Sequence, residues 1–151
     1  MAGGDDAAKV TARYAIVVGE FYTELAERLV SSARRVFEKA GADGVDVFAV
    51  PGAFELPLAA LMAARTERYA GIACLGAVIR GETSHYDHVC NEAARGIQDV
   101  ALRTGVPCGF GLLTVENMDQ AMARSGGGKR DQGSHAAEAV LALLRVRAEL
   151  T

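Results

Sequence analysis

The sequence predicts an α/β protein in which helices cover both faces of one parallel sheet. Short apolar runs alternate along the chain with longer segments whose apolar residues recur at helical spacing. Glycine or proline stands at nearly every change between the two patterns. Strands that alternate with helices are joined by right-handed crossovers, which make the strands parallel and place helices on both sides. The 151 residues are enough for one domain with its own core.

Four strands are predicted from apolar runs that end at turn residues. The third run is the longest and is apolar throughout, which is typical of a strand covered on both faces. The predicted strands cover residues 14–18, 45–50, 71–79 and 110–115. Because ligands bind beyond the carboxyl ends of the strands in such sheets, we expect the residues that follow the strands to share one edge.

Five helices are predicted between and after these strands. Thr23, Ser84 and Asn117 are the expected caps of the first, third and fourth helices. The helices cover residues 23–40, 53–65, 84–103, 117–125 and 135–149. The first helix carries an apolar stripe at helical spacing, made of Leu25, Leu29, Ala33, Val36 and Ala40. Residues 13–151 therefore form one domain, and residues 1–12, rich in glycine, alanine and aspartate, are expected to be a flexible N-terminal tail.

Composition argues against several functional classes. The formal net charge of −3 disfavours nucleic acid and anionic membranes as partners. No apolar run is long enough to span a bilayer, and the first residues lack the features of a signal peptide. Cys74, Cys90 and Cys108 are odd in number and widely spaced, which favours buried thiols over a disulfide framework or a zinc site. We expect a cytoplasmic protein.

The last helix predicts contacts beyond a single subunit. One apolar stripe consists of Ala137, Val140, Leu141, Leu144 and Ala148, and a second consists of Leu143, Val146 and Leu150. One stripe covers the sheet, and the second favours a partner subunit. The alternative is that the second stripe is buried within the same subunit.

Residues 74–88 predict the active site. A continuous apolar strand is broken by Gly81, and a helix then starts at Ser84. Free backbone N–H groups at such a turn bind anions. His85 lies in the first turn of the helix, where a proton-transfer group would face the bound molecule. His88 falls on a similar face, but no acidic or cysteine ligand completes a metal site, so we expect no metal. His88 is then either structural or a neighbour that supports a site residue without touching the substrate.

With these residues in place, the chain resembles the lumazine synthase family. Two long motifs carry the resemblance: residues 50–57, which read VPGAFELP, and residues 75–87, which read LGAVIRGETSHYD. The shorter segments 91–97 and 110–114 support it. The resemblance implies a three-layer, flavodoxin-like sandwich with a four-stranded parallel sheet. It also implies a homo-oligomer with active sites at subunit interfaces, either a pentamer or a 60-subunit icosahedral shell.

The resemblance further implies a reaction of riboflavin biosynthesis. In that reaction 5-amino-6-(D-ribitylamino)uracil condenses with 3,4-dihydroxy-2-butanone 4-phosphate. The products are 6,7-dimethyl-8-ribityllumazine, phosphate and water, and no metal or organic cofactor takes part. Alternatives on the same fold are a non-catalytic protein that binds a flavin or lumazine, and a shell-forming protein without activity.

The resemblance assigns one set of residues to the pyrimidine and ribityl groups. Phe21 would stack on the pyrimidine, although an ordinary core phenylalanine is equally compatible with the sequence. The carboxylate of Glu55 would hold ribityl hydroxyls, or it is simply a carboxylate at a helix N-terminus. Main-chain groups at the end of the third strand would contact the pyrimidine, and Phe110 would face the ring from the adjacent subunit. The full set is Phe21, Ala53, Phe54, Glu55, Ala77, Val78, Ile79 and Phe110.

A second set of residues would bind the phosphate and transfer protons. Gly81, Glu82 and Thr83 would form the phosphate turn through backbone N–H groups and the Thr83 hydroxyl. Arg124 would reach the phosphate from the neighbouring subunit, and a solvated helix-terminal charge is the alternative. His85 is the expected general acid and base.

The chain departs from the family pattern at several positions. Glu20 and Tyr22 flank Phe21 where relatives more often carry arginine and asparagine, and this affects polar contacts rather than stacking. Gln132 replaces a frequent lysine near the pyrimidine, a change that weakens the expected binding, and Ser84 replaces a frequent proline or threonine.

Overall fold

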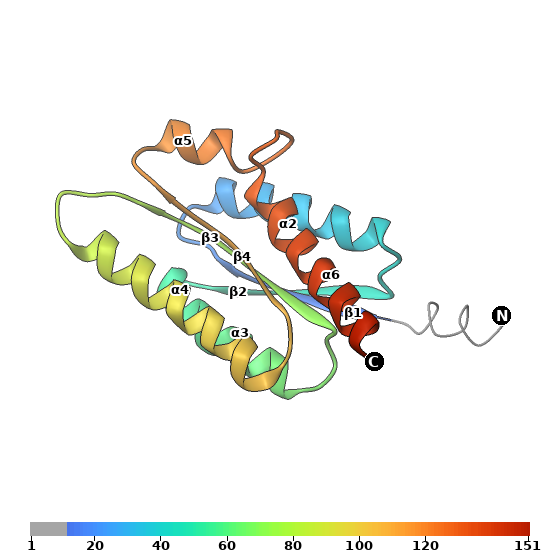
Figure 1. Ribbon diagram of the computed structural model, residues 1–151. Helices are drawn as coiled ribbons and strands as arrows, with labels where there is room; N and C mark the ends of the chain where they lie inside the picture. The colour runs from blue at the N-terminus through green and yellow to red at the C-terminus, as the bar shows by residue number, and fades with distance from the viewer. Residues whose placement is uncertain (1–11) are drawn as a thin grey trace.

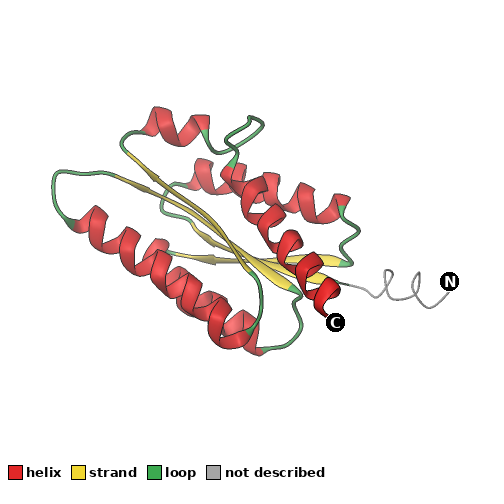
Figure 2. Ribbon diagram, viewed as in Figure 1, coloured by secondary structure: helices red, strands yellow, loops and turns green. Residues whose placement is uncertain are grey.

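Within residues 12–151, which the computed structural model describes, four parallel strands form one sheet between two layers of helices (Figures 1 and 2). The strands lie in the order β2-β1-β3-β4. They are β1 (Arg13–Gly19), β2 (Gly44–Val50), β3 (Gly71–Ile79) and β4 (Cys108–Val115). The predicted four-stranded α/β/α sandwich is confirmed. The expected tail falls almost entirely on residues 1–11, which lie outside the described part of the chain.

The helices divide between the two faces of the sheet (Figure 1). On one face α2 and α6 pack against β1, β3 and β4 around a core that includes Leu29, Leu75 and Val140. On the other face α3 and α4 enclose a second core, which includes Leu56 and Ile97. The elements are α2 (Thr23–Lys39), η1 (Ala53–Glu55), α3 (Leu56–Arg65), α4 (His85–Thr104), α5 (Met118–Ala123) and α6 (Gln132–Leu150).

The central strand β3 explains why two cores form. Its first six residues are all buried, and alternate side chains point to opposite faces of the sheet. Ala73 and Leu75 therefore belong to the α2 and α6 core, whereas Ile72 and Cys74 belong to the α3 and α4 core. This two-sided burial is the physical origin of the unbroken apolar run in the sequence.

On the α2 and α6 face of the sheet, both predicted helix starts need correction. Thr23 is the first residue of α2 and not its cap; Tyr22 occupies the cap position, without a side-chain capping bond to any described residue. The last helix begins at Gln132 and not at His135, because the Asp131 carboxylate accepts hydrogen bonds from the backbone N–H groups of Gly133 (3.0 Å) and Ser134 (3.3 Å). An aspartate in this position satisfies N–H groups that have no partner within the helix.

The predicted apolar stripe of α2 is also partly wrong. Leu25, Leu29 and Ala33 are buried, but Ala40 is exposed. The stripe instead continues to Phe37, whose ring stacks on Tyr14 with centroids 4.2 Å apart. The helix ends before Ala40, since Gly41 adopts a positive φ of 88° that only glycine adopts readily.

The contact between α6 and β4 gives a stability prediction. A Cβ at Gly109 would overlap the backbone carbonyl of Ala136. Because the clash is with backbone atoms, α6 or β4 would have to shift to relieve it. We expect Gly109→Ala to lower the free energy of unfolding by about 3 kcal/mol, the upper end for overpacked sites. Denaturant unfolding at fixed protein concentration measures the loss. The matched control is Gly128→Ala, whose Cβ would meet no described atom within 4 Å; equal midpoints for the two variants would contradict the packing argument.

Candidate active site

The candidate site lies where neighbouring strands send the chain to opposite faces of the sheet. β1 and β3 are adjacent and parallel. After β1 the chain enters α2 on one face, and after β3 it enters α4 on the other. The two connections diverge at the carboxyl edge and leave a crevice, which is the general ligand position in open α/β sheets.

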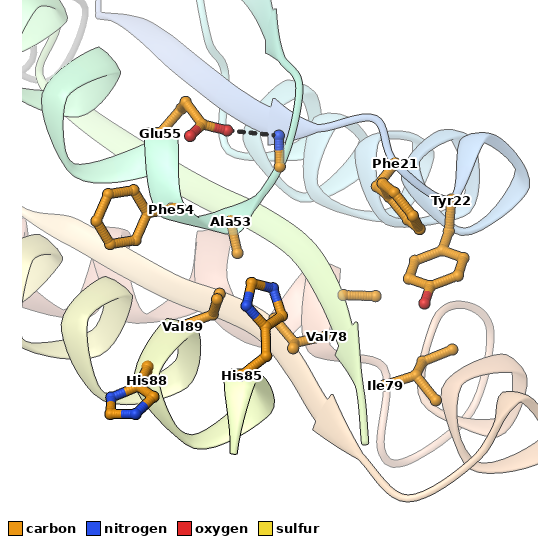
Figure 3. A pocket seen from close by; sticks show the side chains of 12 residues that line it. Phe21, Tyr22, Ala53, Phe54, Glu55, Val78, Ile79, His85, His88 and Val89 are labelled. Carbon is orange, nitrogen blue, oxygen red and sulfur yellow. Dashed lines mark hydrogen bonds between the residues drawn. The ribbon is translucent and has the colours of Figure 1, made fainter. Parts of the chain in front are cut away.

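A cavity of about 590 Å³ occupies this crevice. Figure 3 shows side chains from four separate segments of the chain around it. Eight of the residues predicted from the sequence line it, together with four that were not predicted as ligand contacts. The predicted ones are Phe21, Ala53, Phe54, Glu55, Ala77, Val78, Ile79 and His85. The additional ones are Tyr22, Gly52, His88 and Val89.

Phe21 is positioned by a close approach between two turns. The backbone N–H of Glu20 donates to the Val50 carbonyl at 2.9 Å, which extends the pairing of β1 with β2 past the end of the strand. A Cβ on Gly19 would lie 3.1 Å from the backbone carbon of Gly52, so glycine allows the two turns to approach. Phe21 itself is 76% exposed, and the interpretation as an ordinary core phenylalanine is therefore wrong. An exposed aromatic face beside a cavity suits a flat ligand.

Glu55 has a local structural role in addition to its place on the cavity wall. One carboxylate oxygen accepts a hydrogen bond from the Gly52 backbone N–H at 2.9 Å, drawn as the dashed line in Figure 3. This bond caps the N-terminus of the short helix η1, because Gly52 is its N-cap residue. The interpretation of Glu55 as a helix N-terminal carboxylate is thus correct for one oxygen. The bond also fixes the turn that carries Ala53 and Phe54.

His85 is the first residue of α4, and its ring reaches from the helix start into the cavity between η1 and β3 (Figure 3). Its backbone N–H donates to the Thr83 hydroxyl oxygen at 3.2 Å. Ser84 occupies the cap position but has a helical backbone and makes no side-chain cap bond with the described residues, so the expected cap is wrong and Thr83 takes its role. Thr83 accepts through its oxygen, and no acceptor for its O–H is found among residues 12–151, so the hydroxyl can donate to a ligand.

The surroundings of the two cavity histidines and of the cysteines bear on the predicted absence of metal and disulfide chemistry. His88 also lines the cavity. Between residues 12 and 151 no three His, Cys, Asp or Glu side chains lie close enough together to hold a metal ion. The three described cysteines are free thiols; contact with Cys108 and complete burial raise the pKa of the Cys74 thiol.

The turn of Gly81, Glu82 and Thr83 is exposed beside the cavity and not part of its wall. Arg80, directly before it, forms a salt bridge from Nε to Glu116 at 2.9 Å and lies 3.6 Å from Asp87. Its guanidinium carbon also lies 4.3 Å from the centre of the Tyr86 ring. The hydrogen bond to Glu116 raises the pKa of Arg80. Arg80 therefore ties the turn to the end of β4 and has its charge matched within the chain.

Phe110 and Arg124 are not brought to the cavity. They lie in a second hollow of about 350 Å³ along β4, one of the two edge strands of the sheet. Gln120 and Gln132 add polar groups to the same hollow. Within one chain, the predicted residues therefore fall into two separate groups: the cavity, with the turn at residues 81–83 beside it, and the hollow along β4.

The fold and the cavity together define an α/β protein that binds a small molecule at the switch point of a parallel sheet. The chain belongs to the 6,7-dimethyl-8-ribityllumazine synthase family, whose model matches residues 11–148. The family resemblance noted in the sequence is confirmed.

Several relatives carry the same name, 6,7-dimethyl-8-ribityllumazine synthase. One from Ruthia magnifica subsp. Calyptogena magnifica is 44% identical over 140 residues, covering 88% of this chain and 84% of the relative. One from Nitratidesulfovibrio vulgaris (strain DP4) is 43% identical and covers 91% of this chain and 90% of the relative. One from Salinibacter ruber is 44% identical with the same coverage. In the described residues, no helix combines the length and apolar character needed to cross a membrane.

Proposed function

We propose that the protein is the transferase of riboflavin biosynthesis that makes 6,7-dimethyl-8-ribityllumazine. Its substrates are 5-amino-6-(D-ribitylamino)uracil and 3,4-dihydroxy-2-butanone 4-phosphate. One observation carries the proposal: the exposed ring of Phe21, the turn at residues 52–55 and the His85 side chain all line one cavity at the carboxyl edge of the sheet. Membership of the family supports the choice of reaction.

The cavity accounts for the pyrimidine substrate. The exposed ring of Phe21 offers a stacking surface for the uracil. Residues 77–79 form the carboxyl end of β3, beyond the last residue that pairs with β1. Their backbone groups on that side can donate hydrogen bonds to the edges of the ring and accept hydrogen bonds from them. The turn at Ala53 and Glu55 faces the same cavity, and its polar groups match the hydroxyls of a ribityl chain.

The phosphate-bearing substrate has a different surface available. The exposed turn of Gly81, Glu82 and Thr83 precedes a twenty-residue helix, whose N-terminal N–H groups favour an anion. Thr83 adds its hydroxyl, and Arg124 of a neighbouring subunit would complete the charge match. The Arg80 guanidinium is already paired with Glu116 and Asp87. Arg124 is therefore the better candidate to donate hydrogen bonds from its guanidinium to the phosphate.

The chemistry needs one group that both donates and accepts a proton. The 5-amino nitrogen attacks the ketone carbon, a water molecule leaves, and an imine forms. Removal of a proton from the adjacent carbon then lets the C–O bond to phosphate break, with the electron pair leaving on phosphate. The enol that this elimination leaves takes up a proton at its terminal CH2 carbon and loses its hydroxyl proton, which produces a new ketone. The ribitylamino nitrogen finally attacks this new carbonyl, and loss of water closes the ring. His85, at the cavity wall between the two binding surfaces, is suited to these transfers.

We propose that the active unit is a pentamer in the cytoplasm. The larger assembly that such pentamers would form is a 60-subunit shell. The second hollow lies along β4, an edge strand of the sheet. In the proposed assembly, each subunit would place its Phe110 and Arg124 against the first cavity of the neighbouring subunit. Leu143, Val146 and Leu150 of α6 remain exposed in the single chain, which supports the expectation that this stripe has a partner. The free thiols accord with a reducing compartment.

A direct assay tests the function. Purified protein is mixed with both substrates, and lumazine formation is followed by absorbance or fluorescence against the reaction without protein. We expect product well above that background. Tight binding of riboflavin or a lumazine without product would instead indicate a carrier, and assembly without either would indicate a shell protein.

A further inference from the structure

Arg28 connects two parts of the chain that are far apart in sequence. It lies on α2, yet its Nε donates to the hydroxyl oxygen of Ser125 at 2.8 Å and its Nη2 donates to the carbonyl of Met122 at 3.3 Å. Ser125 is fully buried, and its hydroxyl donates to the same Met122 carbonyl at 3.1 Å. Among residues 12–151, no carboxylate forms a salt bridge with Arg28, so its guanidinium is used for this contact.

The contact fixes the end of α5. Met122 is in the last turn of this short helix, and Arg124 is its C-terminal cap residue. With only six residues, α5 has little stability of its own and depends on tertiary contacts. Arg28 supplies such a contact on both sides of Arg124, at Met122 and at Ser125.

The far end of the loop after Arg124 is fixed as well. The Arg124 carbonyl accepts from the Gln132 backbone N–H at 2.9 Å. Asp131 is buried and accepts from the backbone N–H groups of Gly127 (3.2 Å) and Gly133 (3.0 Å). A Cβ on Gly133 would overlap the backbone of Leu29, the residue after Arg28, so the start of α6 also lies directly against α2.

Through these contacts, the Arg28 side chain of α2 holds the backbone in place on both sides of Arg124. We infer that Arg28 is a positioning residue for phosphate recognition, acting through Arg124; the inference rests on the proposed function. The geometry requires an arginine, because Nε and Nη2 donate in two fixed directions that a single ammonium group does not reproduce. A purely structural role would affect both substrates alike, whereas positioning of Arg124 affects the phosphate-bearing one.

Steady-state kinetics of Arg28→Met with each substrate varied in turn tests the inference. We expect the KM for 3,4-dihydroxy-2-butanone 4-phosphate to rise roughly tenfold, as for a displaced binding group, while the KM for the pyrimidine substrate stays constant. Arg28→Lys should recover only part of the loss. The matched control is Arg35→Met on the same helix, an exposed arginine for which no side-chain hydrogen bond is found among the described residues; we expect it to leave both values unchanged.

The double variant Arg28→Met with Arg124→Ala separates positioning from general damage. If Arg28 acts through Arg124, its replacement adds nothing once the Arg124 guanidinium is gone. Effects that multiply, or a parallel loss for both substrates, would overturn the inference. If Arg28→Met fails to fold, Ser125→Ala removes one acceptor and should raise the same KM to a smaller extent.

The outcome also separates this inference from the proposed function. An unchanged phosphate-substrate KM in Arg124→Ala alone would refute the phosphate role of Arg124. A raised KM in Arg124→Ala together with normal kinetics in Arg28→Met and Ser125→Ala would refute only the positioning role of Arg28.

Discussion

Replacement of His85 by alanine is expected to lower kcat roughly 100-fold, the low end of the effect of a general acid–base group. The reason is that the imidazole lies on the cavity wall between the stacking surface and the exposed phosphate turn. The ring makes no side-chain hydrogen bond to a described residue that would be lost on truncation. Assembly and binding of the pyrimidine substrate should therefore persist, which gel filtration and equilibrium titration measure beside kcat.

Two further histidines serve as comparisons. His135→Ala, at an exposed position on α6, should leave kcat unchanged. His88→Ala tests the neighbouring ring, which also lines the cavity. A normal kcat for His85→Ala with a large loss for His88→Ala would transfer the proton-transfer role to His88.

Replacement of Arg124 by alanine is expected to raise the KM for the phosphate-bearing substrate about 10- to 100-fold, as expected from loss of charge-assisted hydrogen bonds to phosphate. The pyrimidine KM should change little, because the Arg124 guanidinium is assigned to the phosphate, whereas Phe21, Phe110 and the cavity of residues 53–55 and 77–79 are assigned to the pyrimidine substrate. Initial rates with each substrate varied separately measure this. Arg145→Ala, which removes an exposed charge from α6, controls for the overall change in charge.

Complementation between the two variants tests the interface site directly. A site in which one subunit supplies His85 and its neighbour supplies Arg124 can be rebuilt in mixed assemblies of His85→Ala and Arg124→Ala chains. With random mixing at equal amounts, about a quarter of the sites hold both native side chains, and activity should recover in that proportion. Mixed assemblies no more active than the separate variants would show that both residues act within one chain.

The secondary structure was predictable where the signal is local. The bounds of β3 agree with the prediction because an apolar run ends at charged Arg80. The bounds of β1 differ from the prediction by one residue at each end, and β2 and β4 start one and two residues earlier than predicted. The caps were less predictable. A cap depends on the backbone conformation of one residue, and the helical backbone at Ser84 passed that role to Thr83.

The candidate site was predictable to the extent that strand ends meet at one edge. That rule grouped Phe21, residues 51–55, residues 80–85 and the end of the fourth strand. The structure places Phe21, residues 53–55 and His85 around one cavity, with the turn at residues 81–83 beside it, whereas the end of β4 lines the second hollow. His88 carried a usable signal, since it lies one helical turn after His85 on a similar face; the prediction gave it a structural or supporting role and no direct contact with the substrate, whereas it lines the cavity. Tyr22 and Val89 carried none, because side chains of their kind also occur in cores and at surfaces.

By itself, the sequence determined the fold class, the family and most of the residues around the cavity. Hydrophobic periodicity, the two long motifs and the ends of the strands can all be recognised along the chain without knowing how distant elements pack. Only the tertiary structure decided that Phe110 and Arg124 lie in a hollow apart from the cavity. It also decided that Arg28 contacts Ser125 across 97 positions of the chain. The reason is physical: such contacts depend on the relative placement of whole elements, which follows from packing the two cores and not from any local pattern.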